Sequence, residues 1–289
     1  MRIVSTSEML EIEQISKEKF GFEERLIIEN AGLLGAIKIE EILNNKETSG
    51  EIIFLIGKGN NGADGMAMAR HLVNKGFRCR AFVLFPDSEC KEELKFQLSM
   101  GKAFGVSINY IDTVFQLSSY VDEVGACAIV DCLFGTGVQL PLSNFMYDFI
   151  EYVNGVGVPI FSVDIASGVS GDSGEVQGNA ICANITLAIG FPKLGHYIAK
   201  GPRQSGRIEI LKVGFPQSFT EVGDKFLLRP EHMIDLVNPR DKFADKKVYG
   251  HSLVLGGSHG LTGAPALASH ATLRVGSGLV TVATWEPQY

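Results

Sequence analysis

The sequence predicts an α/β protein with a largely parallel sheet. From Glu51 onward, short apolar runs rich in β-branched residues alternate with helical patterns, which is typical of βαβ units. The first run, Ile52–Ile56, leads into a glycine-rich turn. Two later runs, Ala128–Gly137 and Ile160–Gly168, each contain an aspartate followed by small residues. Because the carboxyl ends of parallel strands meet at one edge of a sheet, we expect one site there.

Two helices are expected before the sheet. Ser5 and Glu8 have the spacing of a capping box, and apolar residues follow at helical spacing. A second helical stripe covers Glu24–Leu43. The strands are expected at 51–56, 79–85, 106–110, 127–133, 159–164, 184–190 and 207–213, with helices near 65–75, 89–103, 112–122 and 144–153. The long loop between the last two strands would allow them to pair antiparallel at an edge.

The 289 residues exceed the usual size of one domain, so we expect a large domain and part of a second. We place the first domain at 1–215, a less periodic linker at 216–230 and the second domain at 231–289. The last segment has the pattern of strand, glycine-rich turn, helix and strand. Because about 60 residues leave too much surface exposed, this second domain is expected to be incomplete.

The composition points to a small ligand. A net charge of -7 argues against broad binding of nucleic acid or of an anionic membrane. No run approaches the ~18 apolar residues of a membrane span, and the first residues lack an apolar signal core. Five cysteines, with no C-x-x-C pair, fit reduced thiols. We therefore expect a cytoplasmic protein that binds neither nucleic acid nor membranes.

The turn after the first run resembles a nucleotide-binding loop. Gly57, Gly59 and Gly62 satisfy G-x-G-x-x-G, a weak signal when alone. Backbone N–H groups there could bind a diphosphate, while Asn60 and Asn61, with the nearby Asp64, could bind polar groups or an ion. The alternative is a tight turn with a helix cap. Two asparagines and a carboxylate exceed what a turn requires, which favours the functional interpretation.

Asp131 and Asp164 follow separate apolar runs, and either could be only a helix cap. Their repetition favours a shared site. Carboxylate, amide and Ser167 hydroxyl oxygens suit a hard cation better than zinc or copper. Asp164 could alternatively transfer protons. The stretch Gly135–Gly137, with Thr136 between the glycines, resembles a second phosphate-binding turn, the alternative being a flexible loop.

Three further basic residues have open interpretations. Lys193 and His196 could bind a phosphate or move a proton, or could be an exposed loop pair. We expect His71 to be a packed or surface residue. The sequence contains no evident Ser-His-Asp order, H-x-x-x-H or P-loop motif.

Five ordered motifs resemble a known family, the YjeF N-terminal-like NAD(P)H-hydrate epimerase domain, over about 1–215. They are ENAG (29–32), GNNGADG (59–65), VDCLFGTG (130–137), DIASGVSGDSG (164–174) and KLGH (193–196). From about Glu231, YGHSLVLGGSHGLTGAPALA resembles the beginning of the ribokinase-like ADP-dependent NAD(P)H-hydrate dehydratase. The resemblance implies a Rossmann-like three-layer αβα sandwich followed by an incomplete ribokinase-like segment, as in the fused bacterial repair enzyme.

By this resemblance, the substrate is NADH or NADPH hydrated across a ring double bond (NADHX or NADPHX), and the enzyme is an isomerase that interconverts its R and S epimers. Asp164 is the candidate catalytic residue. The potassium ligands map onto Asn61, Asp131 and Ser167. The candidate substrate-binding residues are Asn60, Asn61, Gly62, Ala63, Asp64, Gly135, Thr136, Gly137, Val138, Gln139, Leu140, Pro141, Asp164 and Lys193. ADP or ATP would serve only the dehydratase part, whose catalytic residues are expected beyond residue 289, so we expect no dehydration by this chain.

Three positions depart from the family pattern. Ala63 replaces a customary glycine and would restrict a positive φ, Leu140 stands at a commonly basic position, and Ala166 replaces a frequent proline. The departures concern affinity more than reaction type.

Two rival functions remain. An NAD(P)-dependent oxidoreductase would use the three glycines with Asp87 on a ribose, but would leave Asp131 and Asp164 without a role. A non-catalytic binding module is the second. A homodimer through the first two helices is also plausible.

Overall fold

The structure is a computed structural model that describes residues 1–43, 50–135, 143–176, 178–236 and 240–285. It divides the chain into two compact units, Met1–Leu228 and Arg229–Tyr289. The division falls inside the expected linker, 216–230. None of the helices in the described part of the chain combines the length and apolar character that crossing a membrane requires.

In the described residues of the first unit, seven strands form one parallel sheet in the order β3-β2-β1-β4-β5-β6-β7. The strands are β1 Glu51–Ile56, β2 Cys79–Val83, β3 Ser107–Tyr110, β4 Ala126–Cys132, β5 Ile160–Val163, β6 Ile185–Ile189 and β7 Arg207–Leu211. The α/β class with a parallel sheet is thus confirmed. The antiparallel pairing expected for the last two strands is wrong, since β6 and β7 pair in parallel. Their connection contains two short helices, η2 (Leu194–His196) and α7 (Gly201–Ser205), and is long enough for a parallel crossover.

The longer helices of this unit are α1 Thr6–Phe20, α2 Glu24–Leu43, α3 Asn60–Asn74, α4 Glu92–Ala103, α5 Val114–Val124 and α6 Asn144–Gly155, with short helices η1 Asp87–Glu89 and α8 Ser218–Glu221. The capping box of α1 is confirmed: the Ser5 N–H donates to Glu8 Oε2 at 2.7 Å, and the Glu8 N–H donates to Ser5 Oγ at 3.2 Å. Helix α2 has the expected limits. Helix α3 begins at Asn60, earlier than expected, so the asparagine pair belongs to a helix rather than a loop.

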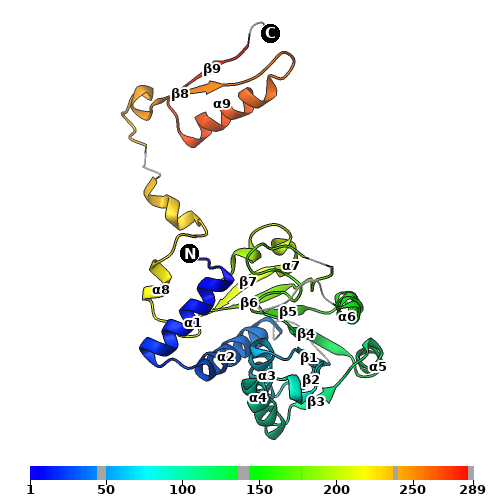
Figure 1. Ribbon diagram of the computed structural model, residues 1–289. Coiled ribbons are helices and arrows are strands. Elements are labelled where there is room, and N and C mark those ends of the chain that lie inside the picture. Colours follow the sequence, from blue (N-terminus) through cyan, green and yellow to red (C-terminus); the bar gives the residue numbers. More distant parts are fainter. Residues whose placement is uncertain (44–49, 136–142, 177, 237–239, 286–289) are drawn as a thin grey trace. The chain divides into compact units, whose positions relative to one another are not determined.

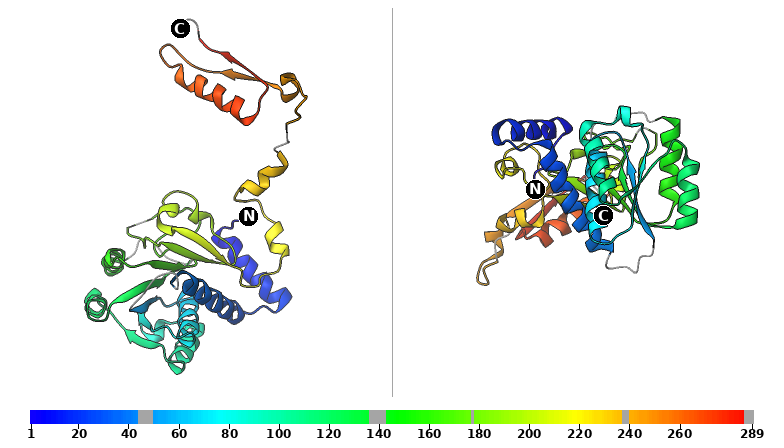
Figure 2. Two further views of the ribbon diagram at one scale, coloured as in Figure 1. Left: turned by 180° about the vertical axis from the view of Figure 1, so that it is seen from behind. Right: turned by 90° about the horizontal axis from the view of Figure 1, so that it is seen from below.

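Helices cover both faces of the sheet, as the alternation of side chains along β1 requires. Ile52, Phe54 and Ile56 belong to a core with α2, α3 and α4, whereas Ile53 and Leu55 belong to a second core with α5 and α6. Figure 1 and the right panel of Figure 2 show the sheet between the blue-to-cyan helices and the green helices. The predicted three-layer αβα arrangement is confirmed.

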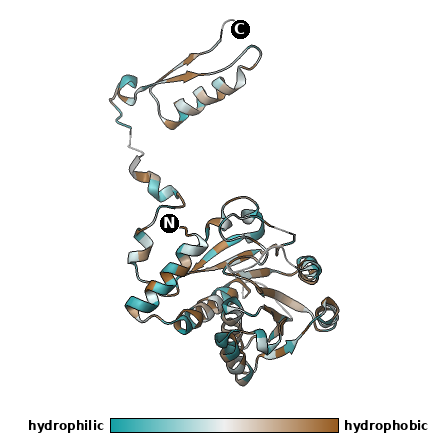
Figure 3. Ribbon diagram, in the orientation of Figure 1, coloured by the Kyte–Doolittle hydropathy of each residue, from teal (hydrophilic) through white to brown (hydrophobic). Residues whose placement is uncertain are grey.

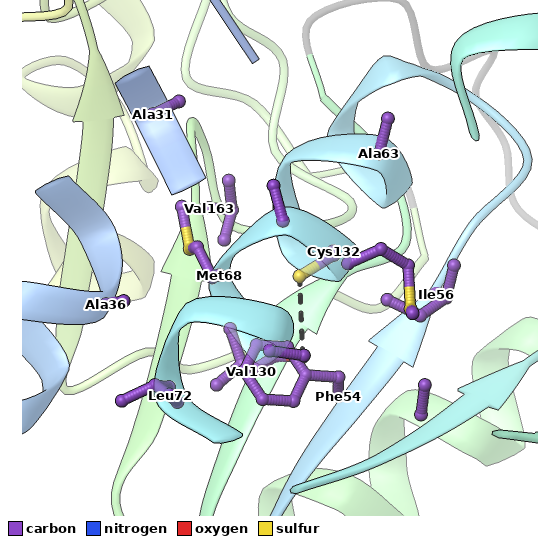
Figure 4. Close-up of a cluster of buried hydrophobic side chains, with 14 of the residues drawn as sticks. Ala31, Ala36, Phe54, Ile56, Ala63, Met68, Leu72, Val130, Cys132 and Val163 are labelled. Atoms are coloured by element: carbon purple, nitrogen blue, oxygen red, sulfur yellow. Dashed lines mark hydrogen bonds between the residues drawn. The ribbon is translucent and has the colours of Figure 1, made fainter. Parts of the chain in front are cut away.

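The first core fixes the position of α3 over the sheet. Figure 4 shows Phe54 and Val130 of the sheet close to Met68 and Leu72 of α3. A Cβ on Gly32 of α2 would lie 2.4 Å from the Cβ of Ala67, so the glycine lets the two helices approach closely. The N-terminus of α3 is therefore held against the carboxyl end of β1.

The second unit contains β8 His251–Leu255, α9 Gly263–Val275 and β9 Leu279–Ala283, with the 3-10 helices η3 Pro230–Leu236 and η4 Lys246–Tyr249. Strands β8 and β9 pair in parallel. Leu253 and Leu255 are 60% and 75% exposed, although both are hydrophobic. Figure 3 shows brown, hydrophobic segments on the strands of this unit. The described part of this unit thus leaves one face of its sheet without a core.

Candidate active site

A cavity of about 350 Å³ lies at the carboxyl ends of β1, β4 and β5. The chain continues from β1 to β2 on one side, whereas β4 lies on the other side of β1, so this edge is a topological switch point. Side chains from α1, α2 and α3 and from the loops after β1, β4, β5 and β6 line the cavity. Ligands of open α/β sheets bind at such a position.

The N-terminus of α3 opens onto this cavity. Gly59 is its N-cap, and a Cβ placed there would meet no atom within 4 Å, so the backbone is accessible to a ligand. The first N–H groups of a helix have no partner within it and, together with the helix dipole, favour an anion. The Asn60 side chain donates to a carboxylate oxygen of Glu24 on α2. Asn60, Asn61 and Asp64 all line the cavity, as the sequence suggested.

Asp64 is nearly fully buried on the first turns of α3. Its Oδ1 has no hydrogen-bond partner among the described residues. Burial, followed by the neighbouring Asp164 carboxylate, raises the pKa of Asp64 well above its usual value. The structure therefore favours a neutral carboxylic acid at this position.

Asp131 lies in β4 and is fully buried. Its Oδ1 accepts from Ser167 Oγ at 2.6 Å and from the Leu133 N–H at 3.2 Å. Its Oδ2 accepts from Ser162 Oγ at 2.7 Å and from the Ser167 N–H at 2.9 Å. Burial raises the pKa of Asp131 even though these four hydrogen bonds oppose the shift. The carboxyl group ties the segments after β4 and β5 together.

The backbone of Phe134 joins the proposed ion ligands. Its carbonyl oxygen accepts from Asn61 Nδ2 at 3.0 Å and lies 3.2 Å from Ser167 Oγ, and its N–H donates to Ser167 Oγ at 3.0 Å. Asn61 Oδ1 is buried and has no hydrogen-bond partner within the described ranges. Asn61 and Ser167 thus meet at a carbonyl group, and Ser167 in turn contacts Asp131. The sequence analysis missed this carbonyl because a backbone oxygen leaves no side-chain signal.

A close approach of two loops makes this meeting possible. A Cβ on Gly57 would lie only 1.7 Å from the Leu133 carbonyl oxygen. The Gly57 N–H donates to the Cys132 carbonyl at 3.0 Å. Only glycine fits here, so the first residue of the G-x-G-x-x-G pattern places the α3 turn beside the segment after β4.

Asp164 follows β5 in a left-handed backbone conformation, with φ 65°. Its Oδ1 accepts from Lys193 Nζ and from the Ile189 N–H, the latter at 3.3 Å. The Asp164 N–H donates to the Leu187 carbonyl at 2.8 Å. A non-glycine residue rarely adopts this φ, and these contacts hold it there. The carboxylate of Asp164 reaches the cavity together with Lys193.

Lys193 and His196 are both buried, so the alternative of an exposed loop pair is wrong. The Lys193 N–H donates to His196 Nδ1 at 3.1 Å, which leaves Nε2 to donate to the Asp164 carbonyl at 3.0 Å. Burial, followed by the charge of Lys193, lowers the pKa of His196 to about 4. The neutral imidazole supports the backbone of Asp164 and does not line the cavity.

The remaining predicted residues divide into three groups. Gly135 lines the cavity, and Gly62 and Ala63 lie in the first turn of α3. The expected restraint at Ala63 is wrong, because this residue is helical and has no positive φ. The predicted contacts at 136–141, namely Thr136, Gly137, Val138, Gln139, Leu140 and Pro141, lie outside the described residues.

His71 and Asp87, which the sequence analysis considered as candidate ligand-binding residues, lie away from the cavity. His71 is a packed residue whose Nε2 lies 2.9 Å from Glu29 Oε1. Asp87 is exposed and accepts from the Tyr110 hydroxyl at 2.5 Å. In the part of the chain that the structure describes, no group of three or more His, Cys, Asp or Glu side chains could hold a metal. The oxygen donors at the cavity are instead amide, hydroxyl, carbonyl and carboxyl groups.

The comparisons with known proteins agree with this architecture. The bifunctional NAD(P)H-hydrate repair enzyme Nnr of Moorella thermoacetica is 30% identical over 98% of this chain and 54% of its own length. This chain thus spans about half the length of that relative. The NAD(P)H-hydrate epimerase of Weissella koreensis is 28% identical over 73% of this chain and 90% of its own length.

The crystal structure of yeast YNL200c, 23% identical, covers 71% of this chain and 86% of its own with a TM-score of 0.62, which shows a shared fold. A sequence model described as YjeF-related protein N-terminus matches residues 24–195, which include α2, α3 and the strands from β1 to β6. The chain belongs to the family of YjeF-related protein N-termini.

Proposed function

We propose that this chain is an isomerase that interconverts the R and S epimers of NAD(P)H-hydrate. The observation that carries the proposal is the ion-paired Asp164 on the wall of a cavity that also receives the N-terminus of α3. Relatives named for this epimerisation, over most of the first unit, support it. The N-terminus of α3 would supply an anion site, and Asp164 a proton-transfer group, in one cavity.

The substrate would lie across the switch point. Its diphosphate would accept from the first N–H groups of α3, and Lys58 and Lys91 at the cavity would add positive charge. The hydrated ring would then approach Asp164 and Lys193. The segment 136–141 would complete the contacts, as the family resemblance implies.

The reacting carbon is bonded to both a hydroxyl group and the ring nitrogen. In one route the hydroxyl oxygen takes a proton and leaves as water with the C–O electron pair, while the nitrogen lone pair forms a C=N bond; water then adds to the other face. In the other route the hydroxyl loses a proton, the C–N electrons go to nitrogen, which takes a proton, and the opened ring closes on the other face. Both routes need a group that gives and takes one proton, and we assign this role to Asp164.

The residues at the β4 end fit a potassium ion. Asn61 Oδ1 is a buried oxygen without a hydrogen-bond partner among the described residues. The Nδ2 of the same side chain donates to the Phe134 carbonyl, which also lies near Ser167 Oγ, and Ser167 Oγ donates to Asp131. Oxygen donors of this kind suit a hard cation. When bound, the ion would supply a fixed positive charge beside the α3 N-terminus.

The nucleotide requirement, the location and the oligomeric state are part of the same proposal. ADP or ATP would serve only the dehydratase part of a longer protein, and we propose no dehydration by this chain. We also propose a cytoplasmic location and a homodimer that forms through α1 and α2.

The test is an exchange assay with the purified R and S hydrates of NADH and NADPH, followed by chromatography. We expect the wild-type chain to interconvert the epimers faster than buffer, and faster in potassium than in lithium. Exchange no faster than buffer would favour a non-catalytic binding module. Hydride transfer to a carbonyl substrate would instead favour an oxidoreductase.

A further inference from the structure

Helix α1 contributes a carboxylate to the cavity. Thr6, Met9, Leu10 and Glu13 lie on one face of α1 and line the same cavity as Asp164. The sequence model of the family begins at residue 24, so α1 lies outside the matched segment. Glu13 is half-buried, and no hydrogen bond or ion pair of its side chain is found within the described residues. Its carboxylate is thus available to a ligand.

The position of α1 relative to the Asp164–Lys193 pair is fixed by the backbone. Val4 forms a parallel bridge with Lys193: its N–H donates to the Pro192 carbonyl at 3.0 Å, and its carbonyl accepts from the Leu194 N–H at 2.9 Å. Met9 and Ile12 pack with Val4 and Phe191 in a small core. The segment that carries Lys193 therefore also anchors the helix that carries Glu13.

The surroundings of Glu13 disfavour its charged form, because the side chain is partly buried beside other carboxyl groups. The charged and titratable groups that line the cavity with Glu13 are Glu24 on α2, Asp64 on α3, Asp164 and Lys193 at the sheet edge, and Lys58 and Lys91 in loops. Burial, followed by the Asp164 carboxylate, raises the pKa of Glu13 to about 7. The surroundings of Glu13 thus bring its pKa close to neutral pH.

We infer that Glu13 is a second proton-transfer group of this site, acting from the α1 wall while Asp164 acts from the sheet edge. The inference rests on the proposed epimerase function. An epimerisation must serve both faces of one carbon, and two carboxyl groups on different walls of one cavity meet this requirement.

The step balances without a co-reactant. Glu13 gives its proton to the hydroxyl oxygen, the C–O electron pair leaves with water, and the nitrogen lone pair forms the C=N bond. Water adds to the other face, the C=N π electrons return to nitrogen, and the Asp164 carboxylate takes a proton from the added water. Nothing is oxidised or reduced. The opposite direction exchanges the two roles, and solvent returns the proton.

The test compares the wild-type chain with Glu13→Gln in the exchange assay across pH. The active form of the pair holds one proton, so wild-type kcat/KM should fall about tenfold per pH unit above the pKa of Glu13. Glu13→Gln should lower kcat/KM about 100-fold and remove this alkaline limb. Glu13→Asp should keep the limb at a reduced rate, which guards against a variant that fails to fold.

The matched control is Glu11→Gln, an exposed residue of the same helix, whose pH profile should equal that of the wild type. An unchanged pH profile in Glu13→Gln, or an effect on KM alone, would overturn the inference. Wild-type exchange that depends on Asp164 but not on Glu13 would overturn only this inference. Absence of wild-type exchange would instead remove the proposed function on which it rests.

Discussion

The ends of β4 and β5 carry two carboxyl groups in contrasting surroundings. Asp131 is fully buried, and four donors from neighbouring segments occupy its oxygens. Asp164 lies on a cavity wall in a left-handed conformation, paired with Lys193. Both residues gave the same sequence signal, an aspartate at the end of an apolar run. The difference teaches that a carboxyl group whose oxygens all accept hydrogen bonds connects neighbouring segments, whereas the one that lines the cavity is the group that we propose to react.

The largest expected effect is on catalysis at the β5 end. Asp164→Asn keeps the shape of the side chain but cannot take a proton, so we expect the epimer exchange rate to fall about 10²–10⁴-fold. The measurement is the exchange assay with each purified epimer. Asp148→Asn, an exposed change on α6, is the matched control. Full activity of Asp164→Asn would show that the contrast with Asp131 has no catalytic meaning.

The converse change should affect stability first. Asp131→Asn replaces one carboxyl oxygen by an NH₂ group, so one hydroxyl and one backbone N–H among the four donors lose their acceptor. We expect the free energy of unfolding to fall by about 2–4 kcal/mol, measured by urea unfolding. Asp148→Asn, the exposed change on α6, should leave the free energy of unfolding unchanged in the same measurement. A loss at Asp131 no larger than the loss at Asp148 would contradict the structural role of Asp131.

A smaller effect is expected from the histidine behind Asp164. The pKa of His196 is lowered from 6.5 to about 4, so its contribution to stability is fully present above pH 6.5. It is lost as the pH falls from 6.5 toward about 4, because the unfolded chain takes up a proton that the folded chain does not. The loss is on the order of 3 kcal/mol.

This pH dependence can be separated from other groups by difference. Urea unfolding of the wild type and of His196→Gln across this window should give a stability difference that shrinks as the pH falls. The pH-linked contributions of Glu13 and Asp131 cancel in that difference. A constant difference would mean that His196 does not resist protonation in the folded chain.

The sequence allowed most of the architecture to be predicted, because periodicity is a local signal. The contact between Asp131 and Ser167 followed from the rule that parallel strands end at one edge. The start of α3 was misjudged, since asparagine and glycine have low helix propensity although they suit a first turn. The pairing of β6 with β7 was also misjudged, because only the two short helices between them reveal a crossover.

The contacts that could not be predicted depend on residues far apart in the chain. Burial of Lys193 beside Asp164 depends on the course of the chain after β6, and the position of Glu13 depends on the bridge between Val4 and Lys193. Neither leaves a pattern in adjacent residues. Functional residues that follow a strand can therefore be predicted from the sequence more readily than a residue such as Glu13, which a distant helix brings to the cavity.

The shared carbonyl of Phe134 has a consequence for mutagenesis. Since this oxygen belongs to the main chain, every replacement of the aromatic ring leaves it in place, and an alanine scan would register only lost packing at residue 134. The ion site that we propose can therefore tolerate substitution at residue 134. An amide-to-ester exchange in the backbone, rather than any codon change, is what would expose its contribution.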